Sequence, residues 1–173
     1  MQRYVKKPRV AAINHTPDRG FVMDNQQVIA TLNSLLQTTK DGSKGFRTCA
    51  KDVKKGSLTP VFESSAQRCD DGAAVLETQI RKLGGEPATS GSVGGTLHRR
   101  WTDIMSSVTG MEEHVVLEEC ERGEDAAMRH YEAALKEDLP ADIEAIVRRQ
   151  YVGVKANHDR IHALRDQSAP RAN

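Results

Sequence analysis

The residues best suited to chemistry lie near the middle of long segments with helical apolar periodicity. Glu124 falls between Cys120 and Ala127 on one apolar stripe, where a lone carboxylate is costly unless it is paired or bound to a metal ion. His158 flanks a second stripe, one turn after Val154. A carboxylate and a neutral imidazole on neighbouring helices of a bundle can together hold iron, manganese or zinc.

Other polar residues and a set of glycines lie at the same level. Asp41, which precedes Gly42, joins Glu124 and His158 as a candidate metal ligand. A glycine lies close to the midpoint of each of four periodic segments: Gly42, Gly72, Gly123 and Gly153. Each costs about 0.5–1 kcal/mol relative to alanine in a helix. Either the helices approach closely there, or space is needed beside a polar group.

The sequence lacks the pattern of a dinuclear iron oxidase. Such a site takes one glutamate from each of two helices and Glu-x-x-His from each of the other two. No Glu-x-x-His occurs, and Lys155 stands three residues before His158. We therefore expect no intact dinuclear site. The favoured interpretation is a hydrogen-bonded pair of Glu124 and His158 that fixes helix register, joined by Lys155 or Gln67. No catalytic residue is assigned, and phosphate-binding motifs are also lacking.

Four helices must position these residues. Apolar residues recur in steps of three and four over residues 26–54, 60–83, 110–137 and 140–166, which predicts long amphipathic helices. The first and last pairs are joined by short turns, whereas about 27 residues separate the second helix from the third. A ferritin-like four-helix bundle needs such a crossover. The alternative is a short-looped bundle with a functional lid at 84–110. We expect a short helix around Trp101 within the crossover.

Composition supports an all-α protein. Aromatic residues make up only 4% of the 173 residues, too few for a typical β-sandwich or barrel. The cysteines Cys49, Cys69 and Cys120 have no paired spacing and fall on the apolar seams, so we expect them to be buried as small apolar groups. No apolar run approaches a membrane span, and the longest near the N-terminus is 10–13. These features predict a cytoplasmic protein.

The formal net charge of +1 hides an uneven distribution. Residues 1–23 carry five basic residues and one aspartate, a net charge of +4, which leaves −3 on the rest of the chain. We expect a basic flexible tail at 1–23, a bundle at 24–167 and a C-terminal tail at 168–173. The basic tail could contact nucleic acid or an anionic surface. Residues 1–22 are either a genuine extension or precede a true start at Met23.

Three groups of motifs carry a resemblance to a known family. They are Leu32-Asn33-Ser34-Leu35-Leu36 with Lys40-Asp41-Gly42-Ser43-Lys44-Gly45-Phe46; Gly84-Gly85-Glu86-Pro87 with Leu97-His98-Arg99-Arg100-Trp101; and Glu119-Cys120-Glu121-Arg122-Gly123-Glu124-Asp125 with Leu139-Pro140 and Lys155-Ala156-Asn157-His158-Asp159. Over residues 23–166 the chain resembles uncharacterised bacterial ferritin-like four-helix-bundle proteins, grouped as a domain of unknown function. The resemblance implies the fold and an association with stress and the cell envelope. Asp41, Glu124 and His158 match polar positions of the family pattern.

These observations lead to two hypotheses of different classes. The first is a non-catalytic, stress-associated bundle that acts as a homo-oligomer or by binding a protein partner. The second is a metal-binding protein with a reduced site for iron, manganese or zinc at Asp41, Glu124 and His158. A third hypothesis, binding of nucleic acid through the tail, rests on charge alone.

Overall fold

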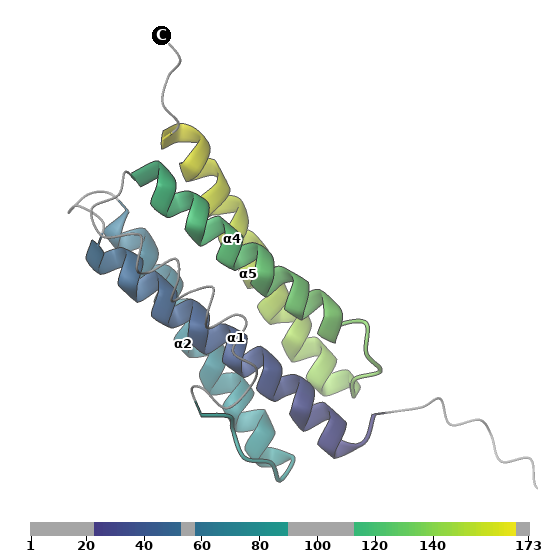
Figure 1. Cartoon of the computed structure of the whole chain (residues 1–173). Coiled ribbons are helices and arrows are strands. Elements are labelled where there is room, and N and C mark those ends of the chain that lie inside the picture. Colours follow the sequence, from purple (N-terminus) through teal and green to yellow (C-terminus); the bar gives the residue numbers. More distant parts are fainter. Residues whose placement is uncertain (1–22, 53–57, 90–112, 169–173) are drawn as a thin grey trace, which may run out of the picture.

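The computed structural model describes residues 23–52, 58–89 and 113–168, which contain four helices and no strand (Figure 1). The helices are α1 (Asn25–Asp52), α2 (Thr59–Lys82), α4 (Glu113–Ala134) and α5 (Ala141–Ser168). Their ends agree with the expected ranges to within one turn. The expected short helix around Trp101 lies outside the described residues, as do residues 1–22 of the expected N-terminal tail and residues 169–173 of the expected C-terminal tail. No helix in the described ranges is both long and apolar enough to cross a membrane.

Local sequence explains where α1 begins and where α2 ends. The carboxylate of Asp24 accepts a hydrogen bond from the Gln27 backbone N–H at 2.8 Å, and the Gln27 side chain accepts one from the Asp24 N–H at 2.9 Å. This reciprocal capping satisfies two backbone donors at the start of α1. At the end of α2, Gly84 has a φ of +81°, a left-handed conformation that glycine adopts without steric cost.

The topology is the expected crossover bundle. α1 and α2 form one antiparallel hairpin, α4 and α5 form another, and α2 ends at the opposite end of the bundle from the start of α4 (Figure 1). Two hydrogen bonds show that α1 and α4 run antiparallel: Thr31 pairs with Glu137, and Thr38, further along α1, pairs with His130, which is earlier in α4. The crossover therefore has to travel the length of the bundle, and the alternative of a short-looped bundle is not what the structure has.

The first residues of the crossover are held against α1. The Asn33 side chain donates to the Glu86 carbonyl at 3.2 Å and accepts from the Ala88 N–H at 2.6 Å. Lys40, two turns further along α1, donates to the Ala88 carbonyl at 3.1 Å. The chain thus sets out from α2 along α1, in the direction of the far end of the bundle.

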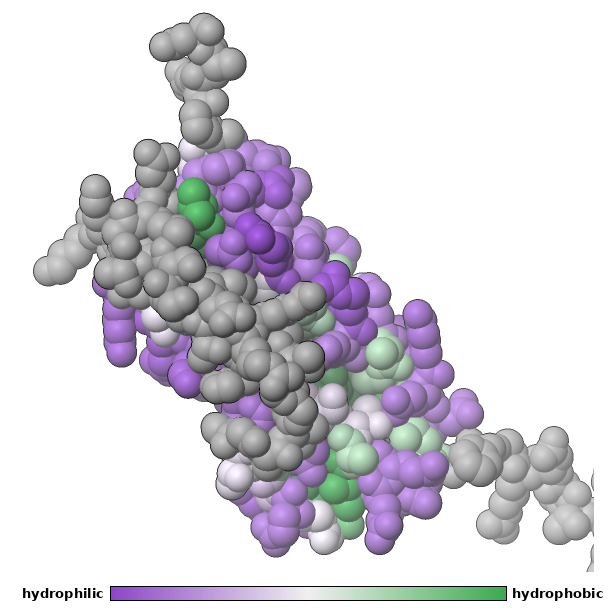
Figure 2. All heavy atoms as spheres, in the orientation of Figure 1, coloured by the Kyte–Doolittle hydropathy of each residue, from purple (hydrophilic) through white to green (hydrophobic). Residues whose placement is uncertain are grey.

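Two apolar clusters make the core, one toward each end of the bundle. The α1-start core is built around residues such as Leu32, Leu76 and Ile143, and the α4-start core around Phe62, Leu117 and Ile161; all six side chains are essentially fully buried. Purple, hydrophilic residues cover most of the described surface in Figure 2, and the paler and green residues show between the two hairpins. The level between the two cores contains the candidate site.

Candidate functional site

A cavity of about 270 Å³ lies between the four helices at the level of the mid-helix glycines. All four glycines line it: Gly42, Gly72, Gly123 and Gly153. α2 packs only sparsely against α5, and the exposed lining residues Asp71, Val75 and Arg149 come from these two helices. The mouth of the cavity therefore lies between α2 and α5.

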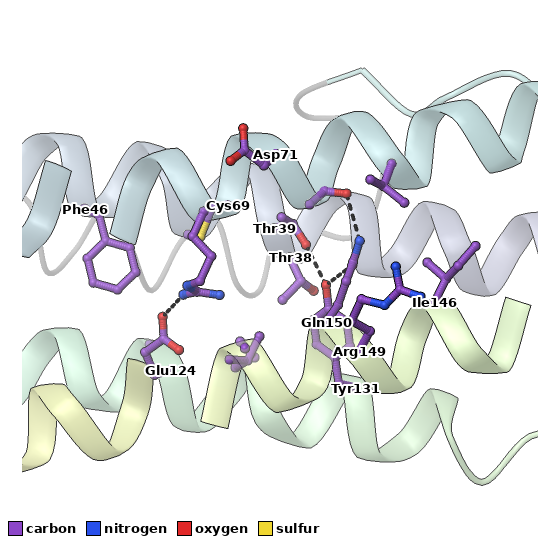
Figure 3. A pocket seen from close by; sticks show the side chains of 18 residues that line it. Thr38, Thr39, Phe46, Cys69, Asp71, Glu124, Tyr131, Ile146, Arg149 and Gln150 are labelled. Carbon is purple, nitrogen blue, oxygen red and sulfur yellow. Dashed lines mark hydrogen bonds and ion pairs between the residues drawn. The ribbon is translucent and has the colours of Figure 1, made fainter. Parts of the chain in front are cut away.

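Glu124 is buried at one end of this cavity, with only 4% of its surface exposed (Figure 3). Its Oε1 forms an ion pair with Nη2 of Arg68 on α2 at 3.0 Å and accepts a hydrogen bond from Nδ2 of Asn157 on α5 at 3.0 Å. Burial raises the pKa of the Glu124 carboxyl, and Arg68 and Asn157 oppose that rise only in part. One carboxylate oxygen thus joins α4 to α5 beside it and to α2 diagonally across the bundle.

A second polar group lies one to two turns away along the bundle. The Tyr131 hydroxyl donates to Oε1 of Gln150 at 2.8 Å, and Nε2 of Gln150 donates to the Gly72 carbonyl at 3.0 Å. Thr39 lies 3.1 Å from the same hydroxyl. Burial raises the pKa of Tyr131 to about 12, so the phenol is neutral at physiological pH. These contacts connect all four helices (Figure 3).

His158 faces a different group of residues. Its Nε2 lies 3.1 Å from Oδ1 of Asp125, and its Nδ1 lies 3.2 Å from Oδ1 of Asp159. Its ring stacks on His162, with the centroids 6.1 Å apart. Asp159 is exposed and Asp125 is partly exposed, so His158 belongs to the outer face of the α4–α5 hairpin. The expected hydrogen-bonded pair of Glu124 and His158 is replaced by Glu124 with Arg68 and Asn157.

Asp41 lies on α1 and is 5% exposed; its Oδ1 accepts a hydrogen bond from Nε2 of Gln37 at 3.0 Å. It does not line the cavity. Within the described ranges, no group of three or more histidine, cysteine, aspartate or glutamate side chains could hold a metal ion. The Arg68 guanidinium cannot lose its proton in a protein, and it forms an ion pair with Glu124, the buried carboxylate of the cavity lining. The described donor set therefore does not fit a dinuclear metal centre.

The three cysteines are buried, as the apolar seams predict. Cys49 and Cys120 lie in the α4-start core with their Sγ atoms 3.4 Å apart. Cys69 lines the cavity, and burial raises the pKa of its thiol to about 12. The Cys69 thiol is therefore protonated at neutral pH, which makes it part of the neutral lining.

Arg68 is the site residue that the sequence analysis missed. Arg68 and Val75 stand four residues before and three residues after Gly72, and all three line the cavity. This spacing around the mid-helix glycine was the signal in the sequence that could have indicated Arg68. Asn157, the second partner of Glu124, lies on α5 about one turn beyond Gly153.

Residues 27–137 match a family described as a domain of unknown function (DUF2383). The match spans more than half of the chain. The chain belongs to this family. The resemblance drawn from the sequence motifs is therefore confirmed.

Comparison with solved structures gives the same fold. A crystal structure described as ferritin-like, diiron-carboxylate proteins from Bacillus anthracis str. Ames is similar to this DUF2383 chain with a TM-score of 0.64 and 17% sequence identity. The match covers 84% of this chain and 99% of the other. At this identity the likeness shows the ferritin-like bundle fold alone. No curated protein matches the chain in sequence.

Proposed function

We propose that this protein is a non-catalytic ferritin-like bundle that acts by association, with copies of itself or with a protein partner. The observation that carries the proposal is the Arg68–Glu124 ion pair, whose atoms lie 3.0 Å apart at mid-bundle. The Arg68 guanidinium then supplies the positive charge that a metal ion supplies in a metal-binding bundle. The pair then serves as a fixed link between helices.

Two features support a structural and binding role. The carboxylate of Glu124 ties α4 to α2 and α5, and polar links of this kind can fix which helices pair and in which register. On the outer face of α5, Val152 is 63% exposed. An exposed valine alone is unremarkable, but it gives a defined place at which to test association through this face.

The alternative is a reduced metal site for iron, manganese or zinc at Asp41, Glu124 and His158. Its support is the fold shared with a diiron-carboxylate protein, whereas the guanidinium on Glu124 opposes it. Elemental analysis of protein purified without a polyhistidine tag or a chelator separates the two hypotheses. We expect no stoichiometric metal after reconstitution with each of the three ions. Stoichiometric metal that disappears in both Glu124→Ala and His158→Ala would establish the alternative and refute the ion-pair proposal.

Association is tested by light scattering on the full chain at several concentrations. We expect a mass above that of one chain, or a specific partner in pull-down experiments. Val152→Lys should weaken assembly through α5, and Arg160→Lys, which keeps the charge of an exposed α5 residue, is the matched control. A strict monomer that captures no partner would contradict the association proposal.

Four further parts of the proposal rest on the sequence. We propose a division into a basic tail at 1–23, the bundle at 24–167 and a C-terminal tail at 168–173. Stress association follows from the family resemblance, and a cytoplasmic location stays a prediction. Binding of nucleic acid or an anionic surface through the tail predicts salt-sensitive binding that is lost when residues 1–22 are deleted. Binding that survives this deletion would exclude the tail as its cause.

A further inference from the structure

Close packing of the helices does not require glycine at Gly72 or Gly153. A Cβ atom added at Gly153 would come no closer than 3.9 Å to its nearest neighbour, Cδ of Arg68. One added at Gly72 would lie 3.6 Å from Cγ2 of Thr39. Both are ordinary van der Waals distances, so alanine would fit. These glycines make the helices less stable than alanine would, and the space that their missing methyl groups leave belongs to the cavity.

At one end of the cavity, two polar atoms lack hydrogen-bond partners. Oε2 of Glu124 and Nε of Arg68 are both buried without a hydrogen-bond partner. Glu124 is more than nine-tenths buried, and a buried polar atom left unpaired costs about 1–3 kcal/mol. Near the other end, Gln150 is already paired with Tyr131 and with the Gly72 carbonyl. The site therefore offers one unpaired acceptor, Oε2 of Glu124 on α4, and one unpaired donor, Nε of Arg68 on α2.

The charges on the cavity wall balance. Arg68 and Arg149 contribute two positive charges, and Glu124 and Asp71 contribute two negative charges. The rest of the lining is mainly apolar or uncharged and includes Phe46, Val75, Ala127, Ile146 and Val154. A charged ligand would enter this lining without a spare counter-ion, which is costly. The lining suits an uncharged ligand.

The size of the cavity limits the ligand further. A dry apolar cavity of about 150 Å³ holds benzene, and this cavity measures about 270 Å³. A two-ring molecule is therefore the appropriate size. Its mouth between α2 and α5 gives a route from solvent.

We propose that the mid-bundle cavity is a binding site for a neutral, largely apolar molecule of about two-ring size that carries one hydroxyl or amide group, with that group at Glu124 and Arg68. Such a group can both donate and accept a hydrogen bond. It would donate to Oε2 of Glu124 and accept from Nε of Arg68. The inference goes beyond the association proposal, because it assigns a ligand to a cavity inside one chain.

Three probes of equal ring system test the chemistry by isothermal titration calorimetry on the full chain. 2-Naphthol has the ring size and the hydroxyl, naphthalene lacks the hydroxyl, and 2-naphthoate carries a negative charge. We expect saturable one-to-one binding of 2-naphthol and binding of the other two that is weaker by roughly tenfold or more, since each leaves a buried group unpaired or a charge uncompensated. Equal affinities for all three probes would overturn the assignment of the polar end.

Variants that fill the cavity test its location. Gly153→Ala and Gly72→Ala should each weaken 2-naphthol binding by roughly tenfold, because an added methyl group overfills the occupied site. Thr78→Ala is the matched control: it also alters an α2 position but lies on the exposed face, outside the cavity. It should bind like the wild type. Circular dichroism should show that all three variants are folded, as the ordinary contact distances at the two glycines predict.

Two results would overturn the inference. One is the absence of saturable 2-naphthol binding up to its solubility limit. The other is binding that both glycine variants leave unchanged, which would place the probe elsewhere on the chain. Neither result bears on the metal analysis or on the oligomeric mass, so the association proposal stands or falls separately.

Discussion

The two ends of the bundle and its middle are built on different principles. At the ends, large side chains such as Leu32 and Leu117 are fully buried and fill the space between the helices. At the middle, the same seams carry glycines, a buried carboxylate and a glutamine, and a cavity remains. The ends therefore hold the fold together, while the middle gives up stability for a polar, partly open site.

The largest loss of stability should come from shortening a buried apolar side chain at one end of the bundle. Leu32→Ala in the α1-start core and Leu117→Ala in the α4-start core should each lower the free energy of unfolding by about 2–5 kcal/mol, because both side chains are fully buried. Urea denaturation followed by circular dichroism measures this. A loss below about 1 kcal/mol at either position would mean that the corresponding end contributes less than the comparison requires.

The second effect concerns the ion pair at the middle. Glu124→Ala should lower the free energy of unfolding by about 1–3 kcal/mol, since it leaves the Arg68 guanidinium and the Asn157 amide without their shared acceptor. The double variant Arg68→Met/Glu124→Met should recover most of this loss, because it removes both charges and keeps volume. Denaturation of Arg68→Met, Glu124→Met and the double variant completes the cycle. No recovery in the double variant would show that the pair itself stabilises the fold.

The contrast between the ends and the middle also decides what the sequence could predict. Apolar periodicity predicted the helices whose buried faces carry Leu32, Leu76 and Ile143, and the length of the second connection predicted the crossover. These follow from helix geometry within one chain segment. The partner of Glu124 depends on the rotation of α2 about its own axis, which periodicity defines only to about one residue. Arg68 beside the seam, rather than His158, therefore reached the carboxylate.

A pH dependence specific to the middle is the third expected effect. Burial raises the pKa of Glu124 against the attraction of Arg68 and His158, so the folded protein holds this proton more tightly than the unfolded chain does. Stability from this group is present below its ordinary pKa of 4.5 and is lost as pH rises through the raised pKa of the folded state. Between these two values the free energy of unfolding should fall with pH more steeply in the wild type than in Glu124→Gln.

Denaturation of the wild type and Glu124→Gln across that interval measures the difference. The comparison is needed because the two proteins share every other titrating group, so that the difference between their curves belongs to Glu124. Exposed acids such as Asp159 and Asp166, whose pKa values are lowered by Lys155 and Arg165 respectively, contribute stability that is lost as the pH falls below their ordinary pKa of 3.8, outside this interval. Parallel pH curves for the two proteins would contradict the assignment of the slope to Glu124.

The smallest effect has the opposite sign. Gly153→Ala should raise the free energy of unfolding by about 0.5–1 kcal/mol, because alanine is the better helix former and its Cβ would meet nothing closer than 3.9 Å. Gly84→Ala provides the control, since a φ of +81° costs an alanine about 1–2 kcal/mol. The same substitution should therefore stabilise the middle of the bundle and destabilise the end of α2. If Gly153→Ala instead lowers the free energy of unfolding, helix packing requires this glycine. The glycine would then not be a loss of stability that leaves room for the cavity.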